Sequence, residues 1–110
     1  MSLGCDIIHF ESHWKVDTLR DRRLLKLYSP SEIIEIKNSS SPKHVEAEMW
    51  SVKEAVYKAS NTKDRRFCPK SISVTPVSNG QWKVFFEAKS FMVLSKTSHD
   101  WVLSWTGCDN

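Results

Sequence analysis

The sequence has few cysteines and no long apolar run, and both absences exclude classes of protein. Its three cysteines, Cys5, Cys68 and Cys108, lie far apart, and none belongs to a Cys-x-x-Cys pair. We therefore expect reduced thiols, as in a cytoplasmic protein, and no zinc site. No apolar stretch approaches the roughly 20 residues of a membrane-spanning helix. No charged start leads into an apolar stretch, so we also expect no signal peptide.

What is present is typical of one small globular domain. The chain has 110 residues, of which 40% are hydrophobic and 26% are charged. These values predict a single domain, residues 1–110, with one modest core. The net charge of +3 is mild, so it permits an acidic partner without requiring one.

The local patterns predict an α+β fold, with helices packed on a small antiparallel sheet. Ser29, Pro30 and Glu32 form a capping box with proline at the first helical position. Asn79-Gly80 is a hairpin signal between two alternating segments. The segment 88–96 is ambiguous, and a short helix is one possibility. We expect strands at 3–10, 71–77, 82–86 and 101–105, the first of them buried, and helices at 16–27, 30–37 and 42–60.

The longest predicted helix, 42–60, places a carboxylate away from its apolar stripe. Glu54 lies roughly opposite the centre of that stripe, and Lys58 follows one turn later. Apolar residues share the Glu54 side, so the helix is expected to pack on two sides, with Glu54 in a partly enclosed crevice. The stripe recurs at spacings of three and four and comprises Val45, Met49, Val52, Val56 and Ala59.

A second carboxylate interrupts the apolar strand 3–10. Burying Asp6 there requires a cation or strong hydrogen bonds. Two carboxylates from separate elements can hold Mg²⁺, which prefers oxygen ligands and is often completed by substrate phosphates. The simpler alternative is a surface ion pair between Glu54 and Lys58, with Asp6 hydrogen-bonded to backbone, and spacing alone favours it.

Two motifs resemble those of the 4′-phosphopantetheinyl transferases. Residues 50–59 (WSVKEAVYKA) resemble that family's aromatic-x-x-Lys-Glu-Ala/Ser-x-x-Lys signature, and residues 4–8 (GCDII) resemble its first motif, Gly-Ile-Asp-Ile-Val. Their order and separation of about fifty residues also match. The length of the chain, and Ile8 where longer members carry a second acid, are closer to the single-domain holo-acyl-carrier-protein synthases.

This resemblance implies a role for each matching residue. Asp6 and Glu54 would bind Mg²⁺, with coenzyme A as co-substrate. Glu54 and Lys58 would be catalytic, since Glu54 would help deprotonate the carrier-protein serine and Lys58 would contact phosphate. Lys53, Lys58 and Lys63 would bind coenzyme A. The serine would attack the β-phosphate and release 3′,5′-adenosine bisphosphate.

The same resemblance suggests partners. Arg20, Arg22 and Arg23 would contact the acidic helix of an acyl or peptidyl carrier protein, as in fatty acid or polyketide biosynthesis. A solvated basic helix face is an equal alternative. The short members of the family form trimers with sites between subunits, so a homotrimer is the family expectation.

Departures from the family pattern leave two rivals open. The usual Gly-Thr-Gly-like turn after the helix is absent at 60–63, and Trp105 stands where a histidine is common. One rival is a degenerate member that binds coenzyme A or a carrier protein without transfer. The other is a small basic module for nucleic acid, whose affinity would fall steeply with salt.

Overall fold

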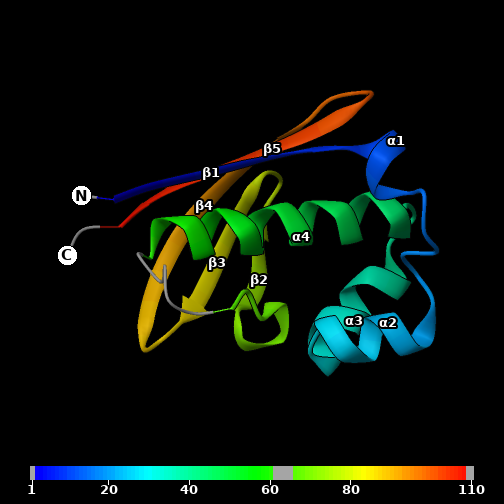
Figure 1. Ribbon diagram of the computed structural model, residues 1–110, viewed down its shortest axis with the longest axis horizontal. Coiled ribbons are helices and arrows are strands. Elements are labelled where there is room, and N and C mark those ends of the chain that lie inside the picture. The colour runs from blue at the N-terminus through cyan, green and yellow to red at the C-terminus, as the bar shows by residue number, and fades with distance from the viewer. Residues whose placement is uncertain (1, 61–65, 109–110) are drawn as a thin grey trace.

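A five-stranded antiparallel sheet carries one long helix across one of its faces (Figure 1). The structure, a computed structural model, describes residues 2–60 and 66–108. The strand order is β1-β5-β4-β3-β2, so the first strand lies at one edge. The elements are β1 (Ser2–His9), α1 (Phe10–His13), α2 (Asp21–Leu27), α3 (Pro30–Asn38), α4 (Pro42–Ala59), the 3₁₀ turn η1 (Pro69–Ser71), β2 (Ser73–Ser78), β3 (Gln81–Phe86), β4 (Lys89–Thr97) and β5 (Trp101–Cys108).

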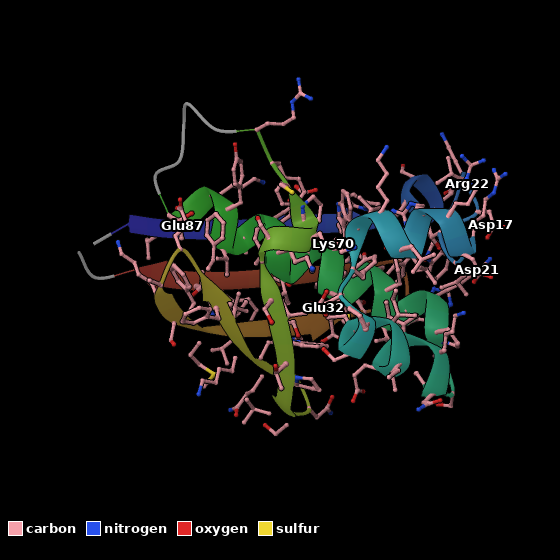
Figure 2. All side chains as sticks on the ribbon, turned by 90° about the horizontal axis from the view of Figure 1, so that it is seen from below. Asp17, Asp21, Arg22, Glu32, Lys70 and Glu87 are labelled. Carbon is pink, nitrogen blue, oxygen red and sulfur yellow. The ribbon has the colours of Figure 1, made fainter. Side chains whose placement is uncertain are left out.

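The predicted α+β architecture is confirmed, and the local start signals explain it. Ser29 Oγ accepts a hydrogen bond from the Glu32 backbone N–H, and Glu32 Oε1 accepts one from the Ser29 N–H, so both halves of the capping box are present. Figure 2 shows Glu32 between the helices and the sheet, where its second oxygen accepts the Val74 N–H at 2.8 Å. One side chain therefore starts α3 and fixes β2 beside it.

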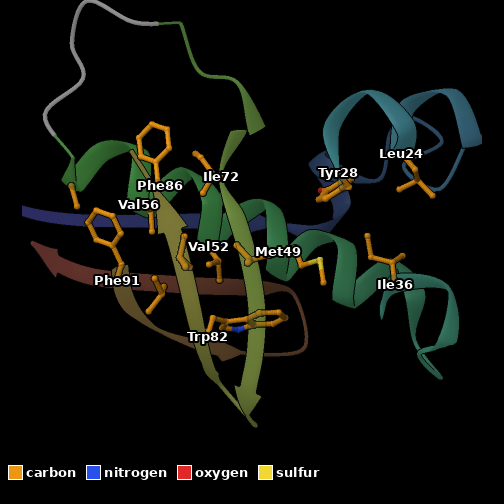
Figure 3. Packing of buried hydrophobic residues seen from close by; sticks show 14 residues of the cluster. Leu24, Tyr28, Ile36, Met49, Val52, Val56, Ile72, Trp82, Phe86 and Phe91 are labelled. Carbon is orange, nitrogen blue, oxygen red and sulfur yellow. The ribbon is translucent and has the colours of Figure 1, made fainter. Parts of the chain in front are cut away.

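The core lies between α4 and the sheet (Figure 3). Met49, Val52 and Val56 are fully buried, as the stripe predicted. Each such side chain contributes roughly 1.5–3 kcal/mol when it leaves water. They pack against sheet residues that point inward, namely Val74, Trp82, Val84, Phe86, Phe91 and Val93.

Strand β1 approaches α4 so closely that only glycine fits at position 4. A Cβ at Gly4 would lie 2.0 Å from the Ala55 carbonyl oxygen and 2.6 Å from the Ala59 nitrogen. Both are backbone atoms of the helix, so neither can rotate away. This contact sets the distance between the strand and the helix.

Gly4→Ala is therefore expected to destabilise the fold by about 2–3 kcal/mol, in the range of overpacked cores. Urea denaturation measures this loss. Cys5→Ala is the matched control, because Cys5 is the exposed neighbour on the same strand, and its effect should stay within about 0.5 kcal/mol. Equal stability of the two variants would contradict the close approach.

The structure differs from the predictions in the burial of one strand and in the secondary structure of one segment. The strand 3–10 was expected to be buried, yet Leu3 and Ile7 are 76% and 50% exposed, because α4 covers only the inner face of the sheet. Segment 88–96, for which a helix was one possibility, is strand β4. Glu87 and Ala88 adopt positive φ angles of 52° and 62°, which build a tight turn without glycine.

The helix predicted at 16–27 begins later, at Asp21. Asp17 Oδ1 accepts the Leu19 N–H at 3.3 Å, and Arg20 is extended, so the chain turns before the helix starts. Among the described residues, no helix is long and apolar enough to cross a membrane.

Candidate functional site

Three of the predicted site residues meet where β1 passes the C-terminal half of α4. Asp6 lies on the inner face of β1, and Glu54 and Lys58 lie one turn apart on α4. The Lys58 ammonium donates to Asp6 Oδ1 at 3.0 Å and to the Cys5 carbonyl oxygen at 3.3 Å. The Asp6 side chain is 8% exposed and that of Lys58 is 51% exposed. The site is thus a buried carboxylate with an accessible cationic rim.

The two carboxyl groups oppose each other's ionisation. Burial, followed by the charge of Asp6 and a hydrogen bond with it, raises the pKa of Glu54 to about 7. The Trp50 indole N–H and the Lys58 charge only partly oppose this. Asp6 Oδ2 is buried and receives no hydrogen bond from the N–H and O–H donors of the described residues. A shared proton or a bound cation would satisfy both groups.

Lys58 remains charged in this setting. Burial alone would lower its pKa, but the hydrogen bond and charge of Asp6, together with the charge of Glu54, raise it above the ordinary value. A cation fixed at the rim can neutralise an anionic substrate while both carboxylates face inward.

The chemistry of these donors fits a hard divalent cation. Two carboxylates supply only part of a Mg²⁺ shell, and waters or substrate phosphates usually supply the rest. Within residues 2–60 and 66–108, no group of three or more His, Cys, Asp or Glu side chains could hold a metal. A cation here would therefore need further oxygen ligands from a bound substrate, as Mg²⁺ does where substrate phosphates complete its coordination.

The raised pKa of Glu54 predicts how the stability of the metal-free protein depends on pH. Between pH 4.5 and about 7 the unfolded chain loses the Glu54 proton while the folded chain keeps it. The free energy of unfolding therefore falls as the pH rises through this range. Glu54→Gln should therefore stabilise the metal-free protein at pH 8 by about 1 kcal/mol, after allowance for solvent screening. Thermal melts at pH 5 and 8 measure the gain. Glu35→Gln, on the exposed face of α3, is the control, and a gain at pH 5 alone would contradict the argument.

Lys53 is corrected from a predicted coenzyme A ligand to a core residue. Its side chain is fully buried on the opposite side of α4 from Asp6, and its ammonium donates to Glu32 Oε1 at 2.8 Å and to the Pro69 carbonyl oxygen at 2.7 Å. Lys53 and Lys58 are five residues apart, so about 140° separates them around the helix. Only Lys58 reaches the Asp6–Glu54 pair.

The predicted basic contacts separate into two groups. Arg20 and Arg22 are exposed. Figure 2 shows Arg22 at the end of the molecule opposite Glu87, which lies in the β3–β4 turn. Arg23 instead turns inward, where its Nη1 donates to Glu46 Oε2 at 3.1 Å. A depression of about 520 Å³ is lined by Arg20, Arg22, Arg23, Lys26 and Leu27. Lys63, the remaining predicted ligand, lies outside the described residues.

Sequence reasoning missed two serines at the site. Ser104 is fully buried directly across the β1–β5 ladder from Asp6, and its hydroxyl has no partner among the described residues. Ser51 Oγ donates to the Asp6 carbonyl oxygen at 3.3 Å. The strand alternation of 101–105 was visible in the sequence, but the register that places Ser104 opposite Asp6 was not.

Comparisons with known proteins show the family and the fold of this chain. Residues 2–106 match the 4′-phosphopantetheinyl transferase superfamily. A search of curated proteins found no match. Among solved structures, holo-[acyl-carrier-protein] synthase from Neisseria meningitidis superposes with a TM-score of 0.83 at 18% identity, covering 99% of this chain and 98% of that one.

Two further solved structures carry coenzyme A or its fragment. The Helicobacter pylori holo-[acyl-carrier-protein] synthase in complex with coenzyme A gives a TM-score of 0.75 at 18% identity, with 97% of this chain and 99% of that chain covered. The Bacillus anthracis synthase in complex with CoA (3′,5′-ADP) gives 0.72 at 19% identity, with 96% and 92% covered. At these identities the likeness establishes a common fold.

Proposed function

Because this chain belongs to the 4′-phosphopantetheinyl transferase superfamily, we propose that it transfers 4′-phosphopantetheine from coenzyme A to a serine of an acyl or peptidyl carrier protein in a Mg²⁺-dependent reaction. The observation that carries the proposal is the pairing of buried Asp6 with half-buried Glu54 beside Lys58, formed by the two motifs that resemble the family's own. The fold shared with synthases crystallised with coenzyme A supports the choice of substrate.

The proposed reaction gives Asp6 and Lys58 one role each and Glu54 two. Asp6 and Glu54 would hold Mg²⁺, which when bound supplies charge neutralisation for the pyrophosphate oxygens. Lys58 would bind a phosphate oxygen at the exposed rim. Glu54 would accept the proton of the carrier serine, whose oxygen forms a bond to the β-phosphorus as the pyrophosphate linkage breaks. The products are the phosphopantetheinylated carrier and 3′,5′-adenosine bisphosphate.

The basic end of the molecule would receive the carrier protein. Arg20 and Arg22 are exposed on or beside α2, next to the depression that Lys26 also lines. The three exposed cations among the four that line this hollow favour an acidic helix over a neutral surface, and they would accelerate encounter at low salt. Cys5 and Cys68 are free cysteines, which supports the proposal that the chain works in the cytoplasm.

We propose a homotrimer, as the family resemblance implies, with the outer face of the sheet as its interface. Neighbouring strands expose large apolar side chains there, and no described element covers them; they are Leu3, Ile7, Phe85, Met92 and Trp105, which are 39–76% exposed. Such a face marks an interface when it is contiguous.

Light scattering is therefore expected to give three times the 12.7 kDa chain mass. Trp105→Lys should shift the protein toward monomer, because it places a charge in the centre of this face. Val16→Lys is the control, since Val16 is 61% exposed and lies away from the sheet. A wild-type protein that is monomeric at all concentrations would refute the trimer.

One experiment tests the function itself. The protein is incubated with coenzyme A, Mg²⁺ and a panel of apo carrier proteins, and the carriers are weighed by mass spectrometry. A mass gain equal to phosphopantetheine on the carrier serine is the expected result. Tight coenzyme A binding with no gain on any carrier would favour a non-catalytic family member instead.

A further inference from the structure

A fully buried carboxylate outside the proposed active site joins three helices. Glu46, on α4, is 0% exposed. Its Oε1 accepts from His13 Nε2 of α1 at 2.8 Å. Its Oε2 accepts from Arg23 Nη1 of α2 at 3.1 Å and from the Tyr28 hydroxyl, just after α2, at 2.5 Å. No step of the proposed reaction uses this group.

Glu46 is held as an anion. Burial alone would raise its pKa, but hydrogen bonds from His13 and Tyr28 and the charges of His13 and Arg23 lower it below its ordinary value. A buried carboxylate fixes the positions of the groups that satisfy it, since moving the Arg23 guanidinium away would leave its charge uncompensated.

Helix α2 depends on contacts with Glu46 to hold its position. It has seven residues, of which Leu24 alone is buried. A helix this short is unstable by itself, so tertiary contacts must hold it. Arg23 also donates to the Thr18 carbonyl oxygen at 2.9 Å, which ties the loop before α2 to the same point.

Glu46 lies on the same side of α4 as the active-site residues Glu54 and Lys58. Glu46, Trp50, Glu54 and Lys58 follow one another at intervals of four residues, so they lie along one side of the helix. The Arg23 guanidinium lies over the Trp50 ring, 5.4 Å from its centroid. Trp50 lies one turn before Glu54 on this side of the helix. The contact of Arg23 with Trp50 thus links α2 to the side of α4 that carries Glu54.

We propose that Glu46 is a positioning residue that sets helix α2, with the exposed Arg22 and the preceding Arg20, at a fixed place relative to the Asp6–Glu54 pair. A carrier protein docked on α2 would then present its serine at the correct distance from Glu54. This inference rests on the proposed function, because it assumes that α2 is the docking surface.

Kinetics with each substrate varied separately tests the inference. Glu46→Gln keeps the shape of the side chain and removes its charge, and Tyr28→Phe removes one hydrogen bond without leaving a buried charge unpaired. Both are expected to raise the KM for the apo carrier about tenfold, leave the KM for coenzyme A within twofold, and weaken carrier binding in the absence of coenzyme A to the same degree. Arg22→Ala, on the surface, should show the same pattern.

Glu48→Gln is the matched control. Glu48 lies two residues away on the same helix and accepts hydrogen bonds from Trp82 and Ser95 on the sheet side. Its KM for the carrier should stay within twofold of wild type. Thermal melts and circular dichroism identify any variant that fails to fold, and Tyr28→Phe then carries the test.

The outcomes separate the two proposals. Wild-type transfer with an unchanged carrier KM in Glu46→Gln and Tyr28→Phe would overturn the positioning role alone. Equal rises in both KM values would also overturn it, because they would indicate general loosening of the fold. A wild-type protein that binds coenzyme A but neither binds nor modifies any carrier would overturn both.

Discussion

Asp6→Asn and Glu54→Gln should each lower the rate of phosphopantetheine transfer by roughly three orders of magnitude, in line with the loss of metal and electrostatic stabilisation at phosphoryl-transfer sites. Each variant removes one of the two carboxylates that meet beside Lys58. Asp6→Asn also leaves the Lys58 ammonium without its charged partner at 3.0 Å. Mass spectrometry of the carrier protein at fixed times measures the rate.

Metal affinity provides the second measurement for these variants. Isothermal titration with Mg²⁺ in the presence of coenzyme A should show binding to the wild type and none to either variant. Glu35→Gln is the control, because Glu35 is an exposed carboxylate on α3, outside the site, and should leave both rate and affinity unchanged. Undiminished Mg²⁺ affinity in both site variants would mean that the cation binds elsewhere.

Glu32→Gln should cost about 3–5 kcal/mol of folding free energy, the range for breaking a buried ion pair from one side. It leaves the Lys53 ammonium uncompensated within the core, where burial already lowers the pKa of Lys53 and Glu32 partly offsets this. The loss affects three elements at once, because Glu32 also caps α3 and accepts the Val74 N–H of β2. Urea denaturation gives the free energy of unfolding.

The double variant Glu32→Gln/Lys53→Met should be destabilised by less than the sum of the single changes, since both charges are then absent. It also tests the corrected role of Lys53. If the double variant is folded, its KM for coenzyme A should match wild type. A tenfold rise in that KM would indicate that Lys53 contributes to coenzyme A binding after all.

Local patterns in the sequence predicted much of the fold. Proline at the start of α4 and the capping box of α3 act within a few residues, so the sequence alone places the starts of both helices. The Asn79-Gly80 turn was predicted for the same reason, and Gly80 has the positive φ of 76° that the turn requires. The start of α2 was misplaced because the Asp17 side chain competes for backbone N–H groups there.

The site was predicted in part. Asp6, Glu54 and Lys58 were predicted from motif spacing, and the structure brings them together. Lys53 was wrongly grouped with them as an accessible ligand, because adjacent residues of a motif need not share a face of the helix. Ser104 was missed because cross-strand register depends on the whole sheet.

The sequence by itself determined the long helix, the hairpin, the family motifs and the Glu54–Lys58 spacing, because each arises from interactions within a few residues or from the identity of the motif. Only the tertiary structure decided which charged groups are buried. Glu46 and Lys53 are as polar in sequence as Glu54 and Lys58, yet both are fully buried. Their burial depends on α1, α2 and α3 closing over α4, and partners 16 to 33 residues away compensate for their charges.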